Sequence, residues 1–290
     1  MIRTAKDRYY DLLKEVSPRL AFRVLEIGAR PMGNEKEPFL DILEHFPESK
    51  LIGFGIDANL CLKMNAESNE QFTYYSQAIG GRNETVPFHE TVHPMCSSLL
   101  RPNAELLSRY NGMEVAELQV VSEVETVSLD SFMASCGEAA IDFVKVDVQG
   151  AELDIFRGAE ETLSDVASIV TEVEFVPLYE DQPLFGDVNE HLCDQGFMFH
   201  KFIALAGRTL KPVVLGKDVN FATQHMWADA IFVRSFEAME SMSGEQLLKL
   251  SALAFVYNSP DVTYACLEKY SDKHPGRELH KEYLDIMTNP

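Results

Sequence analysis

One carboxylate, Asp147, lies where a buried strand gives way to a turn. Residues 143–148 are apolar apart from Lys145 and Asp147. Because burying an unpaired charge in a sheet is costly, we expect a strand with two charges to present them near its end, at a site. Gln149 and Gly150 indicate a turn, and the apolar spacing of residues 151–159 predicts a helix. Open α/β sheets bind ligands at the carboxyl ends of their strands, so Asp147 is the first candidate for contact with a ligand.

A second carboxylate, Asp57, follows the apolar run 51–56. Upstream, a strand at 22–27 runs into a turn that contains Gly28 and Gly33, which is GxxxxG and not the GxGxxG dinucleotide fingerprint. An acid roughly 20 to 30 residues after a glycine turn can accept hydrogen bonds from ribose hydroxyls. Asp57 equally suits the N-cap of a helix that starts at Ala58, and a plain strand-to-helix turn is the alternative for the glycines.

The elements that must position these residues alternate between strand and helix. Strands are predicted at 22–27, 51–57, 71–78, 143–148 and 168–176, with a late pair at 197–204 and 228–234. This order predicts an α/β fold: a doubly wound, mostly parallel sheet with an antiparallel edge hairpin. Residues 84–113 look irregular, and 205–227 look like a long connection between the last two strands.

Three segments are expected along the chain. An amphipathic helix covers residues 1–20, and the sheet domain spans 21–235. Residues 236–290 have the pattern of a helical hairpin, an appendage that packs on the sheet domain or on a second subunit.

Composition narrows the class of function. The 290 residues include 46 acidic and 25 basic side chains, a net charge of -21, which disfavours nucleic acid and anionic membranes as partners. The five cysteines form no CxxC pair, which argues against a disulfide framework or a structural zinc site. The N-terminus has no apolar signal core, and no run approaches the length of a membrane span. A cytoplasmic location is therefore predicted.

Several motifs together resemble a known family. VLEIGA with its glycine turn, SSL, VSLDSF, FVKVDVQGAELDIFRGAE and the later WADAIFVR are similar to the FkbM-type methyltransferases, which transfer a methyl group from S-adenosylmethionine. The resemblance covers roughly residues 20–235 and is most specific over 129–158. It implies the seven-stranded methyltransferase (Rossmann-like) variant of the doubly wound sheet.

The resemblance also implies roles for individual residues around the cofactor. Glu26 would hold the turn or the ammonium group, Gly28 and Gly33 would let the backbone approach, and Arg30 lies in the same turn. Asp57 would bind the ribose hydroxyls, Gln77 and Ala78 would lie against the adenine, and Asp147 would face the methionine end near the sulfonium.

The resemblance implies that the methyl acceptor is a hydroxyl of a sugar, a glycan or a small metabolite, which must lose a proton to a general base. Asp147, Glu172, Glu174 and His200 are the candidates, because each lies near the end of a predicted strand. Asp147 with Glu172 or Glu174 could instead hold a divalent metal that acidifies the acceptor. The structural alternatives are surface carboxylates and a histidine satisfied within an apolar strand.

Departures from the family pattern support a second hypothesis. The glycine turn is one residue longer than usual, and Gln149 stands where the family commonly has glutamate. The alternative function is a catalytically weakened ligand-binding or scaffolding protein that uses its helical tail for assembly, with a homodimer as the open possibility. A nicotinamide-dependent dehydrogenase is disfavoured by the absence of GxGxxG.

Overall fold

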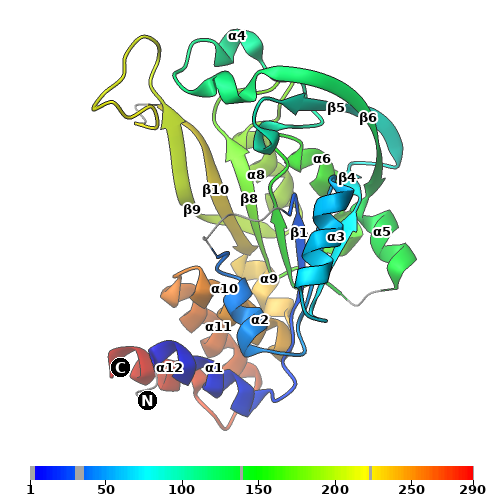
Figure 1. The fold of residues 1–290 in the computed structure, drawn as a ribbon. Coiled ribbons are helices and arrows are strands. Elements are labelled where there is room, and N and C mark those ends of the chain that lie inside the picture. Colours follow the sequence, from blue (N-terminus) through cyan, green and yellow to red (C-terminus); the bar gives the residue numbers. More distant parts are fainter. Residues whose placement is uncertain (1–3, 30–35, 138–139, 222–223, 290) are drawn as a thin grey trace.

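A sheet of seven strands forms the centre of this computed structural model, which describes residues 4–29, 36–137, 140–221 and 224–289 (Figure 1). The strands are β1 (Arg23–Ile27), β2 (Lys50–Gly55), β3 (Phe72–Ser76), β7 (Phe143–Val146), β8 (Ser168–Glu174), β9 (Phe197–Arg208) and β10 (Gln224–Arg234). Their order is β3-β2-β1-β7-β8-β10-β9, and only β10 runs antiparallel to its neighbours. The predicted fold class, a mostly parallel sheet with an antiparallel edge hairpin, is confirmed.

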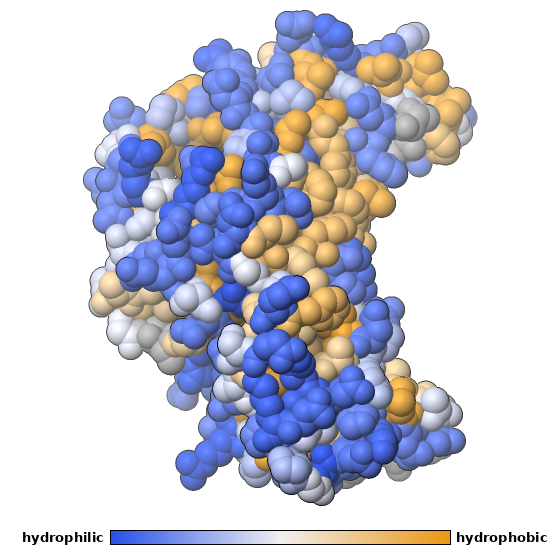
Figure 2. Space-filling view, turned by 180° about the vertical axis from the view of Figure 1, so that it is seen from behind, coloured by the Kyte–Doolittle hydropathy of each residue, from blue (hydrophilic) through white to orange (hydrophobic). Residues whose placement is uncertain are grey.

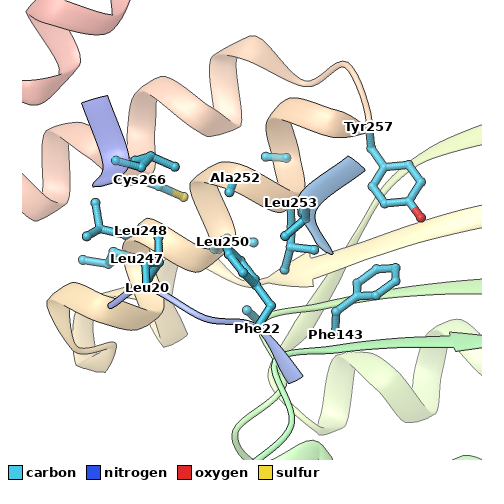
Figure 3. Close-up of a cluster of buried hydrophobic side chains, with 14 of the residues drawn as sticks. Leu20, Phe22, Phe143, Leu247, Leu248, Leu250, Ala252, Leu253, Tyr257 and Cys266 are labelled. Atoms are coloured by element: carbon cyan, nitrogen blue, oxygen red, sulfur yellow. The ribbon is translucent and has the colours of Figure 1, made fainter. Parts of the chain in front are cut away.

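One face of the sheet carries both ends of the chain. Its helices are α1 (Ala5–Val16), α2 (Leu40–His45), α3 (Ala58–Glu67), α9 (Phe236–Ser241), α10 (Gly244–Val256), α11 (Pro260–Lys273) and α12 (Leu279–Thr288). Leu250 and Leu253 of α10 belong to the same buried cluster as Phe143 of β7, and Tyr9 of α1 packs on Phe255 with ring centroids 4.5 Å apart (Figure 3). Segment 236–290 therefore has four helices where a hairpin of two was expected, and it packs directly on the sheet.

The opposite face is covered by shorter helices from the middle of the chain. These are α5 (Leu129–Cys136), α6 (Glu152–Arg157), α7 (Glu160–Leu163) and α8 (Phe185–Asp194). Phe156 and Leu192 from these helices share a second buried cluster with Val144 of β7 and Phe232 of β10. The central strands are thus buried on both faces, which explains why their sequences are nearly continuous apolar runs.

A second, three-stranded sheet lies beside the first, and the sequence analysis missed most of it. It has the order β4 (Ala78–Gly80), β6 (Leu118–Ser128), β5 (Glu84–Thr91), and three short helices follow β5: η1 (Pro94–Cys96), α4 (Ala104–Leu107) and η2 (Met113–Ala116). The prediction that 84–113 is irregular is wrong for β5. Four of the eight residues of β5 and five of the eleven of β6 are exposed, so the apolar alternation that marks a half-buried strand is weak in both.

The edge hairpin is longer than expected. Strands β9 and β10 extend to Arg208 and back to Gln224, so the connection is shorter than the predicted 205–227. Exposed apolar side chains, among them Ile203, Leu205 and Leu215, lie along this edge strand and the following loop, and Figure 2 shows apolar surface along the same side of the molecule.

Candidate active site

A hollow opens at the carboxyl ends of β1, β2 and β7. It is lined by Glu26, Ile27, Gly28, Ala29, Phe54, Gly55, Ile56, Gln77, Ala78, Ile79, Phe88, Pro94, Met95, Ser97, Ser98, Leu99, Lys145, Asp147, Val148 and Gln149. Its volume, counted with the open mouth, is about 840 Å³, and a second hollow between α2 and the α10–α11 turn has about 910 Å³ by the same measure. The volumes of the two hollows do not show which one is the ligand site. Position favours the first hollow, because α/β sheets bind ligands at the carboxyl ends of their strands.

The first turn of this cavity requires a glycine. Gly28 has a φ of +89°, and a Cβ placed on it would lie 1.9 Å from the carbonyl oxygen of Asp147. Its N–H donates to the Phe54 carbonyl at 3.0 Å. Strands β1 and β7 therefore approach each other closely at the wall of the cavity. Arg30 and Gly33, which were assigned to the same turn, lie outside the described residues.

Glu26 contributes a buried carboxylate beside that turn. Burial raises the pKa of Glu26 to about 7, with Glu37 and Asp147 adding to the rise and Lys145 opposing it. Burial alone would lower the pKa of Lys145, but Asp147 and an ion pair with Glu37 at 2.6 Å raise it above its usual value. Lys145 is therefore paired with an acid, and it still lines the cavity.

Asp147 lines the cavity as predicted and is tied to its neighbours by an amide. The Nε2 atom of Gln149 donates to Asp147 Oδ1 at 3.0 Å and to Glu172 Oε2 at 2.5 Å. Glu172 comes from the adjacent strand β8, so two of the proposed base candidates lie side by side. Burial, followed by the charges of Asp147 and Glu174, raises the pKa of Glu172 well above its ordinary value.

Asp57 lies at the same edge of the sheet as Asp147 but does not line the cavity. It caps α3, where its Oδ1 accepts a hydrogen bond from the Leu60 N–H at 3.0 Å, and its side chain is exposed. The N-cap interpretation is confirmed. Ile56, the residue immediately before Asp57, does line the cavity. Asp57 is therefore close to the cavity, and its contact with a ribose stays a prediction.

Gln77 and Ala78 form part of the cavity wall, between the ends of β3 and β4. The predicted third strand is interrupted here, because β3 ends at Ser76 and β4 starts a different sheet at Ala78. Gln77 Nε2 donates to the Glu125 carbonyl at 3.0 Å, which joins this wall to β6.

The structure separates two proposed catalytic residues from the cavity. Glu174 is buried, with 3% of its surface exposed, and it is not among the lining residues. His200 lies on the edge strand β9, four strands from β1, which at about 4.8 Å per strand is roughly 19 Å. Its Nε2 is 2.8 Å from Ser259 Oγ, so the alternative of a satisfied histidine describes its surroundings.

Two further acids near Asp147 escaped the sequence analysis as site residues. Burial raises the pKa of Glu152 to about 7, and burial with the charge of Asp147 raises that of Asp229 to about 6. Glu152 accepts a hydrogen bond from the Val148 N–H at 2.9 Å and so holds the turn after β7. Asp229 pairs with Glu172 across β8 and β10. The sequence signal was present: Glu152 starts the helix, and Asp229 interrupts an apolar strand.

The segment from Pro94 to Leu99 supplies a wall that the sequence analysis did not assign. Ser98 Oγ donates to the carbonyl of Gln149 at 2.7 Å and also accepts from the Leu100 N–H at 3.0 Å. The motif SSL, used above only for the resemblance, therefore holds the turn that contains Gln149.

Within the described ranges, no group of three or more His, Cys, Asp and Glu side chains has the arrangement of a metal site. Burial and the charge of Asp147 raise the pKa values of Glu172 and Asp229, while the Gln149 amide bridges Asp147 and Glu172. The part of the chain that the structure describes therefore gives no support to the divalent-metal alternative.

Comparison with known proteins decides the family. The model of the methyltransferase FkbM domain matches residues 26–199, which include β2, β7 and the carboxyl end of β1. The chain belongs to the FkbM methyltransferase domain family. The FkbM resemblance seen in the sequence is thereby confirmed.

Proteins similar to this FkbM methyltransferase differ in their sequence identity to it and in the length that they match. The chain is 29% identical over 167 residues to the 2-O-methyltransferase NoeI of Sinorhizobium fredii, a match of 55% of this chain and 66% of that protein. A SAM-dependent methyltransferase structure from Aquifex aeolicus matches with 12% identity and a TM-score of 0.28, over 80% of this chain and 94% of the other. That structural likeness adds nothing to the fold that the strand order already gives.

S-adenosylmethionine is the methyl donor implied by the family, and the cavity suits it chemically. The cofactor carries an ammonium and a sulfonium, and Glu26 and Asp147 are acids in one cavity with Gly28, where a Cβ would fill the space. Ile56, Ala78 and Ile79 supply apolar surface for a flat base. None of the described helices is long and apolar enough to cross a membrane.

Proposed function

We propose that this FkbM methyltransferase transfers the methyl group of S-adenosylmethionine to a hydroxyl oxygen of a sugar, a glycan or another small metabolite. The observation that carries the proposal is the set of acids around one cavity at the carboxyl ends of β1 and β7, with Glu26 and Asp147 in its wall and Glu172 bridged to Asp147. Oxygen as the acceptor atom is supported by the relative NoeI, which is a 2-O-methyltransferase.

When bound, the cofactor supplies an electrophilic methyl group on a positively charged sulfur. The chain's own contribution is position and charge. Glu26 and Asp147 favour the cation through their negative charge, and the approach of Gly28 to the Asp147 carbonyl shapes the wall. Holding the reactants in line provides much of the rate of such a displacement.

The acceptor hydroxyl loses its proton to a carboxylate, and Glu172 joins Asp147 as a candidate base. A base is more effective when its pKa is closer to the working pH, and Glu172 has a pKa well above the ordinary glutamate value. A cation bound beside Asp147 lowers these raised pKa values again, because it favours the charged carboxylates. In this arrangement Asp147, which lines the cavity, faces the sulfonium and receives the proton first, whereas Glu172 does not line the cavity and is joined to Asp147 through the Gln149 amide.

Calorimetric titration first tests which cofactor the protein binds. The protein is expected to bind S-adenosylmethionine and S-adenosylhomocysteine and not NADH. Transfer of a labelled methyl group to a panel of neutral glycosides, oligosaccharides and small alcohols then identifies the acceptor. Binding of NADH alone would contradict the proposal. Tight cofactor binding with no acceptor across the panel would favour the ligand-binding or scaffolding alternative.

Assembly belongs to the same proposal. A homodimer through the C-terminal helices stays a prediction, and sedimentation equilibrium of the purified chain checks it. Absence of nucleic acid and membrane partners and a cytoplasmic location likewise stay predictions from the charge of -21 and the sequence pattern.

A further inference from the structure

Two carboxylates are forced together beside the cavity by the register of the sheet. Strands β7 and β8 are parallel, with Val146 opposite Thr171, so the next residues, Asp147 and Glu172, leave adjacent strands at the same level. Two such carboxylates cannot both ionise freely, and they commonly share a proton or a cation. Here the group between them is a neutral amide.

The orientation of that amide is fixed by its partners. Gln149 Nε2 has two hydrogens, and its two acceptors are Asp147 Oδ1 at 3.0 Å and Glu172 Oε2 at 2.5 Å. Turned the other way, the amide oxygen would face both carboxylates and repel them. On its far side, Oε1 lies 3.3 Å from the hydroxyl of Tyr179, which can donate to it.

The backbone of Gln149 is held in an uncommon conformation to allow this. Its φ is +62°, in the left-handed region that residues other than glycine rarely adopt. The Ser98 hydroxyl fixes its carbonyl at 2.7 Å. Such a residue persists only where the surrounding contacts determine it, and these residues cluster at functional sites.

We propose that Gln149 is a positioning residue of the methyl-transfer site, whose amide donates to the carboxylates of Asp147 and Glu172 and holds them side by side. The inference rests on the proposed function. A glutamate at this position would place a third acid between the other two, whereas glutamine supplies donors to both. Hydrogen bonds from the amide favour the charged forms of both carboxylates, so the pair presents more negative charge to the cationic sulfur of S-adenosylmethionine than it would without Gln149.

The test compares the charged cofactor with its uncharged product. S-adenosylhomocysteine lacks the sulfonium, so the ratio of its Kd to that of S-adenosylmethionine reports the negative charge at this end of the cavity. Gln149→Met keeps the length of the side chain and leaves the backbone conformation equally accessible, but it removes the amide. In this variant we expect the ratio to fall about tenfold at pH 7, which is the scale of one lost hydrogen bond to a charged group. The pH at which the ratio is half-maximal should rise by about one unit, because the unclamped pair binds a proton more tightly.

Controls separate this role from a structural one. Gln119→Met, on the exposed surface of β6, should leave both Kd values unchanged. Glu172→Gln, a second variant should Gln149→Met fail to fold, should lower the ratio and flatten its pH dependence. Equal weakening of both ligands in Gln149→Met, with an unchanged pH profile, would overturn the clamp while leaving the proposed function intact. If the unaltered protein binds neither ligand, the proposed function itself fails.

Discussion

One face of the central sheet changes character halfway along its strands. The apolar half consists of Val24, Phe143, Val170 and Ile231, which lie in one buried cluster. The charged half consists of Glu26, Lys145, Asp147, Glu172 and Asp229, each two or four residues along the same strands. Because side chains alternate between faces with a period of two, both halves point the same way.

What differs between the halves is the layer that covers them. Helix α10 packs over the apolar half through Leu250 and Leu253, as Figure 3 shows beside Phe143. The charged half lies beyond the end of this helix, toward the carboxyl ends of the strands. There, burial and crowding raise the pKa values of Glu26 and Glu172, so ionisation is unfavourable. One half of the face stabilises the fold, and the proposed function explains why the other half keeps charged side chains at a cost in stability.

The largest expected effect comes from the apolar half. Phe143 is fully buried and packs against Phe39 and Tyr257, with ring centroids 5.5 and 5.8 Å apart. Phe143→Ala should lower the free energy of unfolding by about 3–5 kcal/mol, since the transfer of the ring and the cavity left behind both count. Urea denaturation measures it. Leu62→Ala, at a side chain with 68% of its surface exposed, should change stability by less than about 0.5 kcal/mol. Similar losses in the two variants would contradict the division of roles.

In the charged half, Asp147→Asn should have the opposite signature. Loss of the carboxylate should weaken binding of S-adenosylmethionine by about 10- to 100-fold, the scale of a charged contact. Stability should stay the same or increase, because Asp147 contributes to the raised pKa of Glu172 and Asp229. Titration calorimetry and thermal unfolding give the two readouts, with Asp154→Asn on the exposed face of α6 as the matched control. A less stable variant with unchanged affinity would show that Asp147 is structural.

The charged half also predicts how stability depends on pH. Burial raises the pKa of both Glu26 and Glu152 from 4.5 to about 7. Between those values the folded protein holds protons that the unfolded chain has released, so stability should fall as pH rises from 5 to 7.5. The expected loss is about 2 kcal/mol from each of the two groups, because each contributes up to ~1.4 kcal/mol per pH unit. Urea unfolding across this range checks it, and Glu152→Gln should flatten the slope. Stability that increases over the same range would contradict the raised values.

The buried central strands could be predicted from the sequence, whereas the exposed strands and short helices could not. The central strands were predicted because burial on both faces leaves an apolar run, and the helix predicted at 151–159 contains α6. Strand β5 was not predicted, since half of its residues are exposed, Pro87 interrupts it, and only Val86 and Phe88 alternate as apolar side chains. The missed helices α9 and α12 are short, at 6 and 10 residues. They are stabilised by packing that local sequence does not encode.

The candidate site was predictable where a residue's role depends on its own strand. Asp147 was found because it ends an apolar run beside a turn, whereas Glu26 was assigned through the family resemblance, and both line the cavity. The pairing of Asp147 with Glu172 depends on the register between two strands, which pattern analysis does not supply. His200 was chosen by the same end-of-strand rule, but its strand lies at the far edge of the sheet. Sequence indicates the level of a residue along a strand, and strand order decides which residues meet.

The smallest effect should arise at the boundary between the halves, where Glu37 pairs with Lys145 at 2.6 Å. Glu37→Gln removes that ion pair, but Asp147 and Glu26 also attract Lys145, so the lysine is not left without a countercharge. Loss of Glu37 also relieves repulsion on Glu26 and should lower its pKa. We therefore expect stability to change by less than about 1 kcal/mol in urea unfolding, as for other partly exposed pairs. Glu44→Gln, at the exposed end of α2, is the control. A loss above about 2 kcal/mol would mean that this ion pair fastens α2 to the sheet, and the charged half would then carry part of the fold.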